Sequence, residues 1–491
     1  MPSKSPPPQR VQPSHDWPLF DTAATRKLEQ IALARSAENG LMQRAGLATA
    51  RLALAMAPHS QTIWIAAGPG NNGGDGMQAA LHLHQWGKQV VVTWLGDPQS
   101  SPSDAASANR RARAAGVLFA NAPPDDWDLC IDALLGIGAA RPPSGLMAQW
   151  IVRMNAAPAP ILSVDMPTGL HADTGVAAPD TVRASATLCL LTLKPGLFTA
   201  DGRDHSMQVW LDELQINAAS LLPELAASAR LSGAPACSTR RHATHKGSYG
   251  SLAVVGGAPG MAGAALLAAM AAVHAGAGKV FLCPLDDRPP VLSADHAELM
   301  LRDIARIDPH GMTVVVGCGG GERVRAHLPR LLSTAARLVL DADALNALAN
   351  DAQLQGQLRT RAARNLPSVL TPHPLEAARL LKVNSAQIQS DRIGAAQQLA
   401  AEYQCVVVVK GSGTVITAPG RTPRINPTGN ARLATAGTGD VLAGMVGAAL
   451  ATGMPAFEAA CTAVYRHGAA ADRWPADTGL SASRLANAPE R

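Results

Sequence analysis

The sequence predicts two α/β domains, each built on a parallel sheet. Short apolar runs typical of β-strands alternate with helical patterns along the whole chain, and glycine-rich turns separate them. The 491 residues are about three times the usual length of one domain. Hydrophobic residues make up 47% of the chain and charged residues 16%, which supplies apolar surface for two cores and excludes an intrinsically disordered protein.

The strand-like runs fall into two sets. Those of the first half are residues 62–66, 89–94, 129–131, 161–164, 186–193 and 208–211. Those of the second half are residues 252–255, 279–282, 313–316, 338–340, 368–370, 405–409 and 414–416. The two halves carry different glycine motifs, so we expect a fusion of two distinct domains and no internal repeat.

Residues 217–238 are rich in Ala, Ser, Leu and Pro and have no strand pattern. We therefore expect a disordered N-terminus at 1–15, a first domain at 16–217, a linker at 218–237 and a second domain at 238–491. The Pro-rich start lacks the apolar region of a secretory signal. The stretch 261–278 is almost free of charge, but it is rich in Ala and Gly and contains His274, which favours a buried helix over a membrane span.

Composition limits the partners of the chain. Aromatic residues make up only 3%, and 42 basic against 37 acidic residues leave a net charge of +5, so we expect neither nucleic-acid binding nor a membrane partner. The seven cysteines include no C-x-x-C pair. This pattern favours a reducing cytoplasm over a disulfide framework or a zinc site.

The first motif follows the strand 62–66. Residues 68–76 read G-P-G-N-N-G-G-D-G and lead into a helix expected at 77–86. Such a loop exposes backbone N–H groups, and the helix dipole behind it favours a phosphate. An ordinary turn is the alternative, but five glycines with two Asn and one Asp exceed what a turn needs.

Two aspartates follow neighbouring strands of the same domain. Asp132 comes after 129–131 and precedes a Gly-Ile-Gly segment, and Asp165 comes after 161–164. Either could cap a helix. Because ligands of open α/β sheets bind outside the carboxyl ends of the strands, we expect both to join the glycine loop in one site.

These segments resemble the NAD(P)H-hydrate epimerase domain over about residues 16–217. The resemblance rests on the glycine loop, on D-A-L-L-G-I-G at Asp132, on V-D-M-P-T-G at Val164, on Lys194-Pro195-Gly196 and on the opening segment Leu41–Gly46. It implies a Rossmann-like open parallel sheet. It also implies a set of residues that bind the hydrated dinucleotide: Asn71, Asn72, Gly73, Gly74, Asp75, Gly136, Ile137, Gly138, Ala139, Ala140, Arg141, Pro142 and Asp165.

The same resemblance implies a potassium ion held by Asn72, Asp132 and Thr168. The family usually has Ser in place of Thr168, and Thr keeps the oxygen ligand. Epimerisation moves a proton at a carbon next to an enamine, and Asp165 is our candidate acid/base for that step.

The second half carries a different constellation. Residues 430–444 read N-A-R-L-A-T-A-G-T-G-D-V-L-A-G, so that Gly437–Gly439 would offer free N–H groups at a helix start. Asp440 beside them could take a hydroxyl proton while these groups stabilise a transferring phosphoryl group. The alternative is that Asp440 only caps the helix. We interpret Cys318 as a small core residue.

Two further features of this half stay open from the residues alone. His373 could be a packed turn residue between two prolines. Asp341 and Asp343 could be helix caps or carboxylates that face a cation.

The second half resembles the ribokinase-like ADP/ATP-dependent NAD(P)H-hydrate dehydratase domain over about residues 238–491. This resemblance implies adenine-nucleotide contacts at Lys410, Gly411, Ser412, Gly413, Thr414 and Gly439. It implies contacts to the hydrated dinucleotide at Ala264, Gly319, Gly321, His373 and Asp440. Two departures are Cys318-Gly319-Gly320 for a usual Pro-Gly-Leu, and Leu375 for the Gly that commonly follows His-Pro; they leave the register of the glycine-loop contacts open.

Together the two resemblances imply a repair enzyme for hydrated NADH and NADPH. One half would interconvert the R and S hydrates, and the other would dehydrate the S hydrate at the expense of ADP, giving AMP and phosphate. ATP is the alternative donor, magnesium a further cation, and we expect a cytoplasmic homo-oligomer. The rival hypothesis is a ribokinase-like small-alcohol kinase fused to a non-catalytic nucleotide-binding module.

Overall fold

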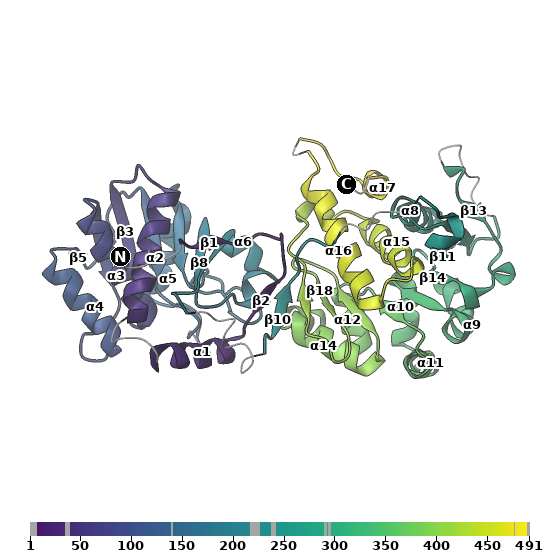
Figure 1. Ribbon diagram of the computed structural model, residues 1–491, viewed down its shortest axis with the longest axis horizontal. Coiled ribbons are helices and arrows are strands. Elements are labelled where there is room, and N and C mark those ends of the chain that lie inside the picture. Colours follow the sequence, from purple (N-terminus) through teal and green to yellow (C-terminus); the bar gives the residue numbers. More distant parts are fainter. Residues whose placement is uncertain are drawn as a thin grey trace. The chain divides into compact units, whose positions relative to one another are not determined.

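The computed structural model of the chain describes residues 7–34, 40–138, 141–216, 226–236, 242–288, 292, 296–475 and 477–488. The chain forms two compact units (Figure 1). The first unit comprises Met1–Gln12 and Trp17–Arg230, and the second comprises Pro13–Asp16 and Leu231–Arg491. Both are α/β units with largely parallel sheets, which confirms the predicted fold class.

The sheet of the first unit has the strand order β1-β9-β8-β7-β6-β3-β4-β5. Its strands are β1 (Gln9–Arg10), β3 (Thr62–Ala67), β4 (Gln89–Trp94), β5 (Leu118–Ala120), β6 (Leu129–Ala133), β7 (Ile161–Val164), β8 (Ala186–Leu190) and β9 (Gln208–Asp212). From β3 the chain moves outward to β4 and β5, and it then returns to β6 on the other side of β3. Since β3 and β6 are parallel, a crevice forms outside their carboxyl ends.

The core of the first unit lies on both faces of this sheet. Ile63 and Ile65 pack into one buried cluster, while Trp64 and Ala66 pack into the other. This alternation is what a strand covered on both faces requires. The covering helices are α1 (Thr22–Ala34), α2 (Gly40–Met56), α3 (Asn71–Gln85), α4 (Ser103–Ala114), α5 (Leu146–Ala156) and α6 (Gly202–Ser206).

Helix α3 begins at Asn71. The sequence had predicted a start at residue 77, so that prediction is wrong by six residues. Gly73, Gly74 and Gly76 of the motif are therefore helical, and they permit close packing. A Cβ at Gly73 would lie 2.0 Å from the carbonyl oxygen of Gly68, and one at Gly76 would lie 2.5 Å from the Cβ of Ala133. The pattern of a phosphate loop thus serves helix packing as well as exposed N–H groups.

Short strands occur in three segments for which we expected none. β1 lies within the predicted disordered segment 1–15 and pairs antiparallel with β9. β10 (Ala229–Leu231) lies within the predicted linker, and β2 (Trp17–Leu19) opens the first domain. Strands this short show little apolar periodicity, so their order rests on backbone pairing that the sequence does not display.

In the second unit the strands follow the order β13-β12-β11-β14-β15-β16-β17-β18-β19. They are β11 (Ser251–Gly256), β12 (Lys279–Pro284), β13 (Met300–Leu301), β14 (Thr313–Val316), β15 (Arg337–Leu340), β16 (Ser368–Leu370), β17 (Val406–Val409), β18 (Val415–Thr417) and β19 (Arg424–Ile425). The strands from β13 to β17 are parallel, and β18 and β19 turn antiparallel. The order reverses between β11 and β14, so a second crevice lies at their carboxyl ends.

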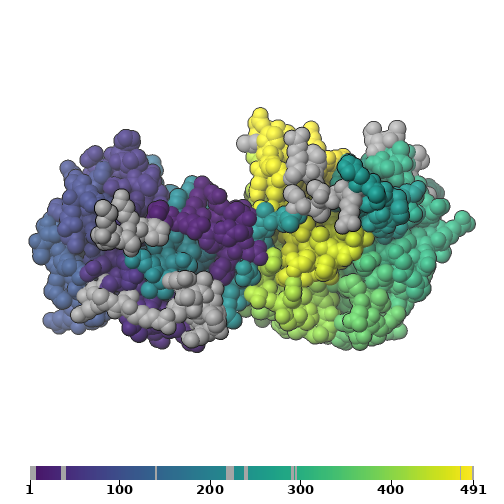
Figure 2. All heavy atoms as spheres, viewed as in Figure 1, coloured from purple at the N-terminus to yellow at the C-terminus, as the bar shows by residue number. Residues whose placement is uncertain are grey.

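Figure 2 shows the end of the chain, in yellow, on the surface turned to the viewer. Helices cover both faces of the second sheet. They are α8 (Ala262–His274), α9 (Leu328–Thr334), α10 (Ala342–Ala349), α11 (Ala352–Ala363), α12 (Pro374–Leu381), α13 (Ser385–Ser390), α14 (Arg392–Tyr403), α15 (Thr438–Ala451), α16 (Ala456–Asp472) and α17 (Ala482–Ala486). The uncharged stretch at 261–278 forms the buried helix α8, as expected. Within the described ranges, no helix combines the length and hydropathy that a membrane span needs.

The segment Pro13–Asp16 belongs to the second unit although it lies near the start of the chain. Asp16 accepts a hydrogen bond of 2.7 Å from the Gly233 N–H and pairs with Arg424 at 3.1 Å. The Pro13 carbonyl accepts bonds from the Ala234 N–H and the Tyr465 hydroxyl. A fragment of residues 235–491 would lack all of these contacts, because each involves Pro13 or Asp16.

We predict that Asp16→Ala loosens this edge of the second unit. The substitution removes one charge-assisted hydrogen bond and one partly exposed ion pair, together about 1 to 2 kcal/mol. Backbone amides of residues 229–234 and 424–425 should then exchange with deuterium roughly tenfold faster in a peptide-level exchange experiment. Asp21→Ala, which removes the carboxylate bound to the Ala24 N–H in the first unit, is the control. Unchanged exchange in the Asp16 variant would contradict this account.

Candidate functional sites

The crevice of the first unit contains a buried carboxylate that no cation neutralises among the described residues. Asp132, in β6, is fully buried. Its oxygens accept hydrogen bonds from the Thr168 hydroxyl at 2.7 Å, the Thr168 N–H at 2.9 Å, the Ser163 hydroxyl at 2.8 Å and the Leu134 N–H at 3.3 Å. Burial raises the pKa of Asp132, and these donors oppose the rise.

Asp165 lies directly after β7 in a left-handed conformation with φ of 65°. A non-glycine residue adopts this conformation at some cost in free energy, so its surroundings must hold it there. Its carboxylate forms an ion pair with the fully buried Lys194 and accepts the Ile137 N–H at 3.3 Å. Lys194 also donates to the Leu190 carbonyl at 3.1 Å. We had noted Lys194 only as part of a motif and had given it no role.

Asn72 faces the same crevice from the first turn of α3. Its side-chain oxygen and nitrogen are both buried, and neither has a hydrogen-bond partner in the described part of the chain. A Cβ at Gly136 would lie 3.1 Å from an Asp165 oxygen and 3.4 Å from the Asn72 oxygen. The structure thus brings together the predicted residues Asn72, Gly136 and Asp165. Such an unsatisfied amide is costly unless a ligand or ion completes it.

The remaining predicted residues lie on the segments that carry Asn72 and Gly136. Asn71, Gly73, Gly74 and Asp75 lie in the first turns of α3, Ile137 and Gly138 follow β6, and Arg141 and Pro142 are exposed. Ala139 and Ala140 lie outside the described residues.

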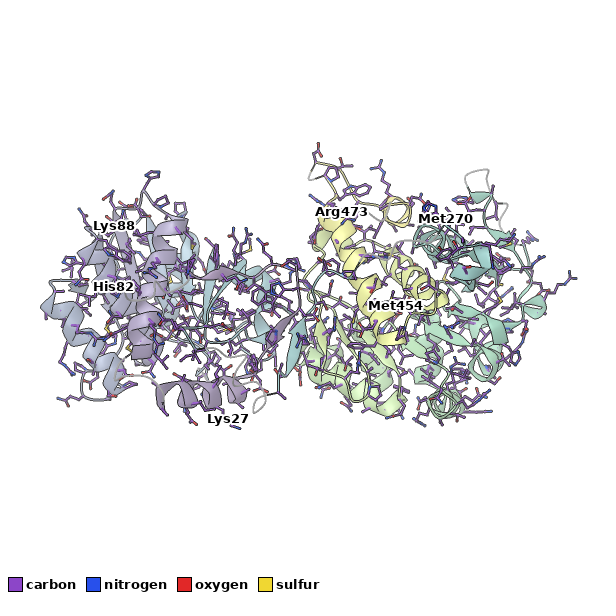
Figure 3. All side chains as sticks on the ribbon, in the orientation of Figure 1. Lys27, His82, Lys88, Met270, Met454 and Arg473 are labelled. Carbon is purple, nitrogen blue, oxygen red and sulfur yellow. The ribbon has the colours of Figure 1, made fainter. Side chains whose placement is uncertain are left out.

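Two further acidic groups interact electrostatically with Asp165. Burial raises the pKa of Asp75 well above its usual range, and the Asp165 carboxylate raises it further. Burial and Asp165 also raise the pKa of Glu29. Glu29 lies on α1, where Leu28 is buried and Lys27 points to solvent (Figure 3). Sequence reasoning missed Glu29, because a single Glu on an amphipathic helix carries no motif.

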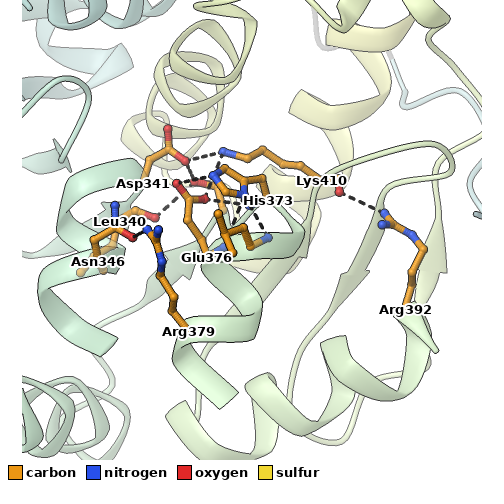
Figure 4. A network of polar contacts seen from close by, with 10 residues as sticks. Leu340, Asp341, Asn346, His373, Glu376, Arg379, Arg392 and Lys410 are labelled. Atoms are coloured by element: carbon orange, nitrogen blue, oxygen red, sulfur yellow. Dashed lines mark hydrogen bonds and ion pairs between the residues drawn. The ribbon is translucent and has the colours of Figure 1, made fainter. Parts of the chain in front are cut away.

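The second site is built on strand ends of the second unit, around an ion pair (Figure 4). Lys410, after β17, pairs with Asp341, after β15, at 2.7 Å, and lies 3.9 Å from Glu376. The Thr371 hydroxyl donates to the same Asp341 oxygen at 2.7 Å. Asp341 therefore faces a cation, and its side chain does not cap α10. Asp343 instead accepts the Gly321 N–H at 2.8 Å.

His373 caps helix α12 and is exposed, a role that differs from the packed turn residue offered as the alternative from sequence. Its Nδ1 accepts the N–H groups of Leu375 and Glu376 at 3.1 and 3.3 Å. Its Nε2 lies 3.3 Å from the Glu376 carboxylate. Burial raises the pKa of Glu376 to about 7, although Lys410 opposes the rise. Glu376 joins the site through contacts across three strands, which its position in the sequence does not reveal.

Asp440 lies in the first turn of α15, and the N-cap of that helix is Gly437, with φ of 90°. Burial and the nearby Asp341 raise the pKa of Asp440 to about 6. The buried Cys318 thiol shares a hydrogen bond with the Asp440 carboxylate. Burial also raises the pKa of this thiol well above its usual range. Cys318 is a core residue, as expected, but it also touches the site.

Two of the residues predicted to contact the nucleotide, Lys410 and Gly439, lie close together. A Cβ at Gly439 would lie 3.4 Å from the Lys410 ammonium, so the helix start and the segment after β17 meet. The buried Arg392 donates to the carbonyls of Val409 and Lys410, both at 3.1 Å, and fixes the end of β17 (Figure 4). Gly411, Ser412, Gly413 and Thr414 follow, and the Thr414 hydroxyl donates to the Gly411 carbonyl at 3.0 Å.

The predicted glycine-loop residues pack against the start of α8. A Cβ at Gly319 would lie 2.9 Å from the Cβ of Ala264, and one at Gly321 would lie 3.1 Å from the Met261 side chain. Both glycines have positive φ, which other residues rarely adopt.

Comparisons with known proteins assign both halves. A family model described as NAD(P)H-hydrate dehydratase matches residues 252–489, and one described as YjeF-related protein N-terminus matches residues 38–196. The chain is 35% identical to the bifunctional NAD(P)H-hydrate repair enzyme of Escherichia coli K12 over 88% of its own length and 84% of that protein. It is 33% identical to the enzyme of the same description from Coxiella burnetii over 93% of its own length and 94% of that protein. The ADP-dependent (S)-NAD(P)H-hydrate dehydratase of Neisseria meningitidis is 44% identical over 50% of this chain and 84% of its own.

We predict that His467 makes the second unit sensitive to acid. His467 is buried on α16 at 2.9 Å from the Thr438 carbonyl, and burial lowers its pKa from 6.5 to about 4. The unfolded chain therefore binds a proton near pH 6.5 that the folded chain does not. Stability should be full above that pH and should fall by about 3 kcal/mol as the pH drops to 4.

Urea unfolding of the full chain at pH 7 and pH 4.5 measures this effect. His467→Gln should lose less stability between the two pH values than the unmodified chain. His84→Gln, in the first unit, should behave as the unmodified chain does. An equal acid loss with and without His467 would refute the assignment.

Proposed function

The chain belongs to the bifunctional NAD(P)H-hydrate repair enzymes, and from this premise we propose how its residues divide the chemistry. The first unit interconverts the R and S hydrates around Asp165 and Lys194. The second unit dehydrates the S hydrate with ADP around Asp440 and Lys410. The observation that supports this division is that each unit has its own lysine–aspartate ion pair, formed by residues that follow its strands. The small-alcohol kinase hypothesis is not favoured, because the relatives that cover most of the chain are repair enzymes.

In the second unit, Asp440 acts as the general base. Its carboxylate takes the proton of the ring hydroxyl while that oxygen attacks the terminal phosphorus of ADP. AMP leaves. Cleavage of the ring C–O bond then releases phosphate, and loss of a proton from the neighbouring ring carbon forms the double bond that restores NAD(P)H. The N–H groups at the start of α15 and the Lys410 ammonium stabilise the charge of the transferring group. The pKa of Asp440 suits this role, since a base that titrates near 6 is ionised at neutral pH.

In the first unit, Asp165 and Lys194 form the acid/base pair. Epimerisation needs a proton removed from a carbon next to the enamine and returned to that carbon. A carboxylate and an ammonium in direct contact can exchange that proton between them. The strained Asp165 backbone and the Ile137 N–H fix the carboxylate beside Gly136 and Asn72. The N–H groups at the start of α3 would bind the phosphates of the dinucleotide.

The residues around Asp132 fit a potassium ion. The amide oxygen of Asn72 has no hydrogen-bond partner among the described residues, and the Asp132 carboxylate has no cation beside it. Both groups offer hard oxygen ligands of the kind that an alkali cation prefers. Such an ion would bind Asp132 and Thr168 oxygens that also accept hydrogen bonds within the protein. When bound, it would supply a positive charge that draws the dinucleotide phosphates toward α3.

Several finer properties complete the proposal. ADP is the donor, with ATP as an alternative and magnesium as the ion that accompanies the nucleotide. We further propose a cytoplasmic homo-oligomer that acts on hydrates of both NADH and NADPH.

We expect Asp440→Asn to lower dehydration of the S hydrate by about 10² to 10⁴. In the unmodified chain, kcat/KM for dehydration should fall tenfold per pH unit below about 6, because Asp440 becomes protonated there. The pH profile of the variant should lack this fall in kcat/KM, and the variant should still bind ADP. Asp351→Asn, which keeps a cap on α11, should retain the rate. Full activity of the variant would exclude Asp440 as the base. So would a fall in kcat/KM of the unmodified chain that begins only near the ordinary pKa of an aspartate.

We expect the epimerase reaction to depend on potassium. Exchange of potassium for tetramethylammonium should slow the interconversion of the R and S hydrates, followed by chromatography, and should leave dehydration of the S hydrate unchanged. Asn72→Ala should reduce the response to potassium. An epimerisation rate that is indifferent to the cation would show that the first unit works without it.

A further inference from the structure

The second site contains a group of potential metal ligands that differs from an acidic cluster. The sulfur of Cys318 and carboxylate oxygens of Asp341 and Asp440 all lie within 4.8 Å of one another. A zinc ion binds sulfur at about 2.3 Å and oxygen at about 2.1 Å, so two of its ligands can be about 4.4 Å apart. The three groups come from different strand ends and from α15. A small rotation of Asp440, which is less buried than the other two, would bring all three within reach of one ion.

The ligands are available for such an ion. Thr371 and Lys410 both bind Oδ1 of Asp341, and Oδ2 has no hydrogen bond within the described ranges. Asp341 is 2% exposed, and an ion on its second oxygen would displace no hydrogen bond of the carboxylate. The Cys318 thiol interacts with Asp440, and loss of its proton to solvent would provide the third ligand.

The local charge also favours a cation. The carboxylates of Asp341, Glu376 and Asp440 surround the one ammonium group of Lys410. Lys410 occupies Oδ1 of Asp341 and would remain there as the ion binds Oδ2. Burial of this excess negative charge is costly, and a divalent ion relieves it.

We propose that Cys318, Asp341 and Asp440 form a binding site for a soft or borderline divalent cation, of the class of Zn²⁺, Co²⁺ and Cd²⁺. The thiolate selects these ions over Mg²⁺, which prefers oxygen ligands. A bound ion occupies the Asp440 carboxylate, so it inhibits dehydration and leaves epimerisation in the first unit untouched. Inhibition rests on the proposed role of Asp440, whereas binding of the ion does not.

The first experiment measures binding without activity. Co²⁺ is titrated into the full chain, and its thiolate-to-metal charge-transfer absorption is recorded. We expect one Co²⁺ whose band is lost in both Cys318→Ser and Cys318→Ala. The band should persist in Cys283→Ser, which alters a fully buried cysteine of β12. A band that survives in both Cys318 variants, or is absent from the unmodified chain, would overturn the site.

The second experiment measures inhibition of dehydration by Zn²⁺, relative to the zinc-free rate of each variant. The zinc concentration for half-inhibition should rise at least roughly tenfold in Cys318→Ser, as expected for the loss of a ligand, and stay constant in Cys283→Ser. Equal inhibition of both variants would contradict the proposal. If Asp440→Asn dehydrates normally while the Co²⁺ band depends on Cys318, the site stands and the assigned base is wrong.

Discussion

Parallel pairing is the constraint on which both sites depend. Every parallel strand must end at the same edge of its sheet, and the chain must leave that edge through a turn. Residues that are far apart in the sequence therefore come together at this edge. In the first unit they follow β6 and β7, and in the second they follow β14, β15, β16 and β17. Apolar side chains fill both faces of each sheet. The polar residues that the chemistry needs can then lie only at this edge.

The two sites solve the problem of buried charge in similar ways. Each sets a lysine against an aspartate, Lys194 with Asp165 and Lys410 with Asp341. In each, further carboxylates are left without a cation of their own, and burial raises their pKa, as for Asp132 and Asp440. The charge balance of both sites is thus completed by what binds there: phosphates meet the lysines and N–H groups, and cations or acidic hydrogens meet the carboxylates.

The sequence predicted the parts of these sites that follow a strand directly. Asp132, Asp165 and Lys410 are recognisable because an apolar run precedes each of them, and Asp440 because it follows three residues of a helix start. Lys194 stands within a motif but received no role, and Glu376 was not singled out, since the partners of both residues lie on other elements. Glu29 had no pattern to mark it. The start of α3 was misplaced by six residues, because glycines in a helix resemble a loop until their neighbours, Gly68 and Ala133, are known.

The central claim is that two separate centres act in sequence on one diffusible substrate. The most direct test mixes the full-length Asp165→Asn and Asp440→Asn chains and follows the absorbance of reduced nicotinamide, with mixed hydrates and ADP supplied. Alone, the first variant should convert only the S hydrate and the second should convert neither, whereas the mixture should recover both hydrates. If either substitution abolished both activities, or if the mixture recovered no more than the first variant alone, one shared site would have to replace the two described here.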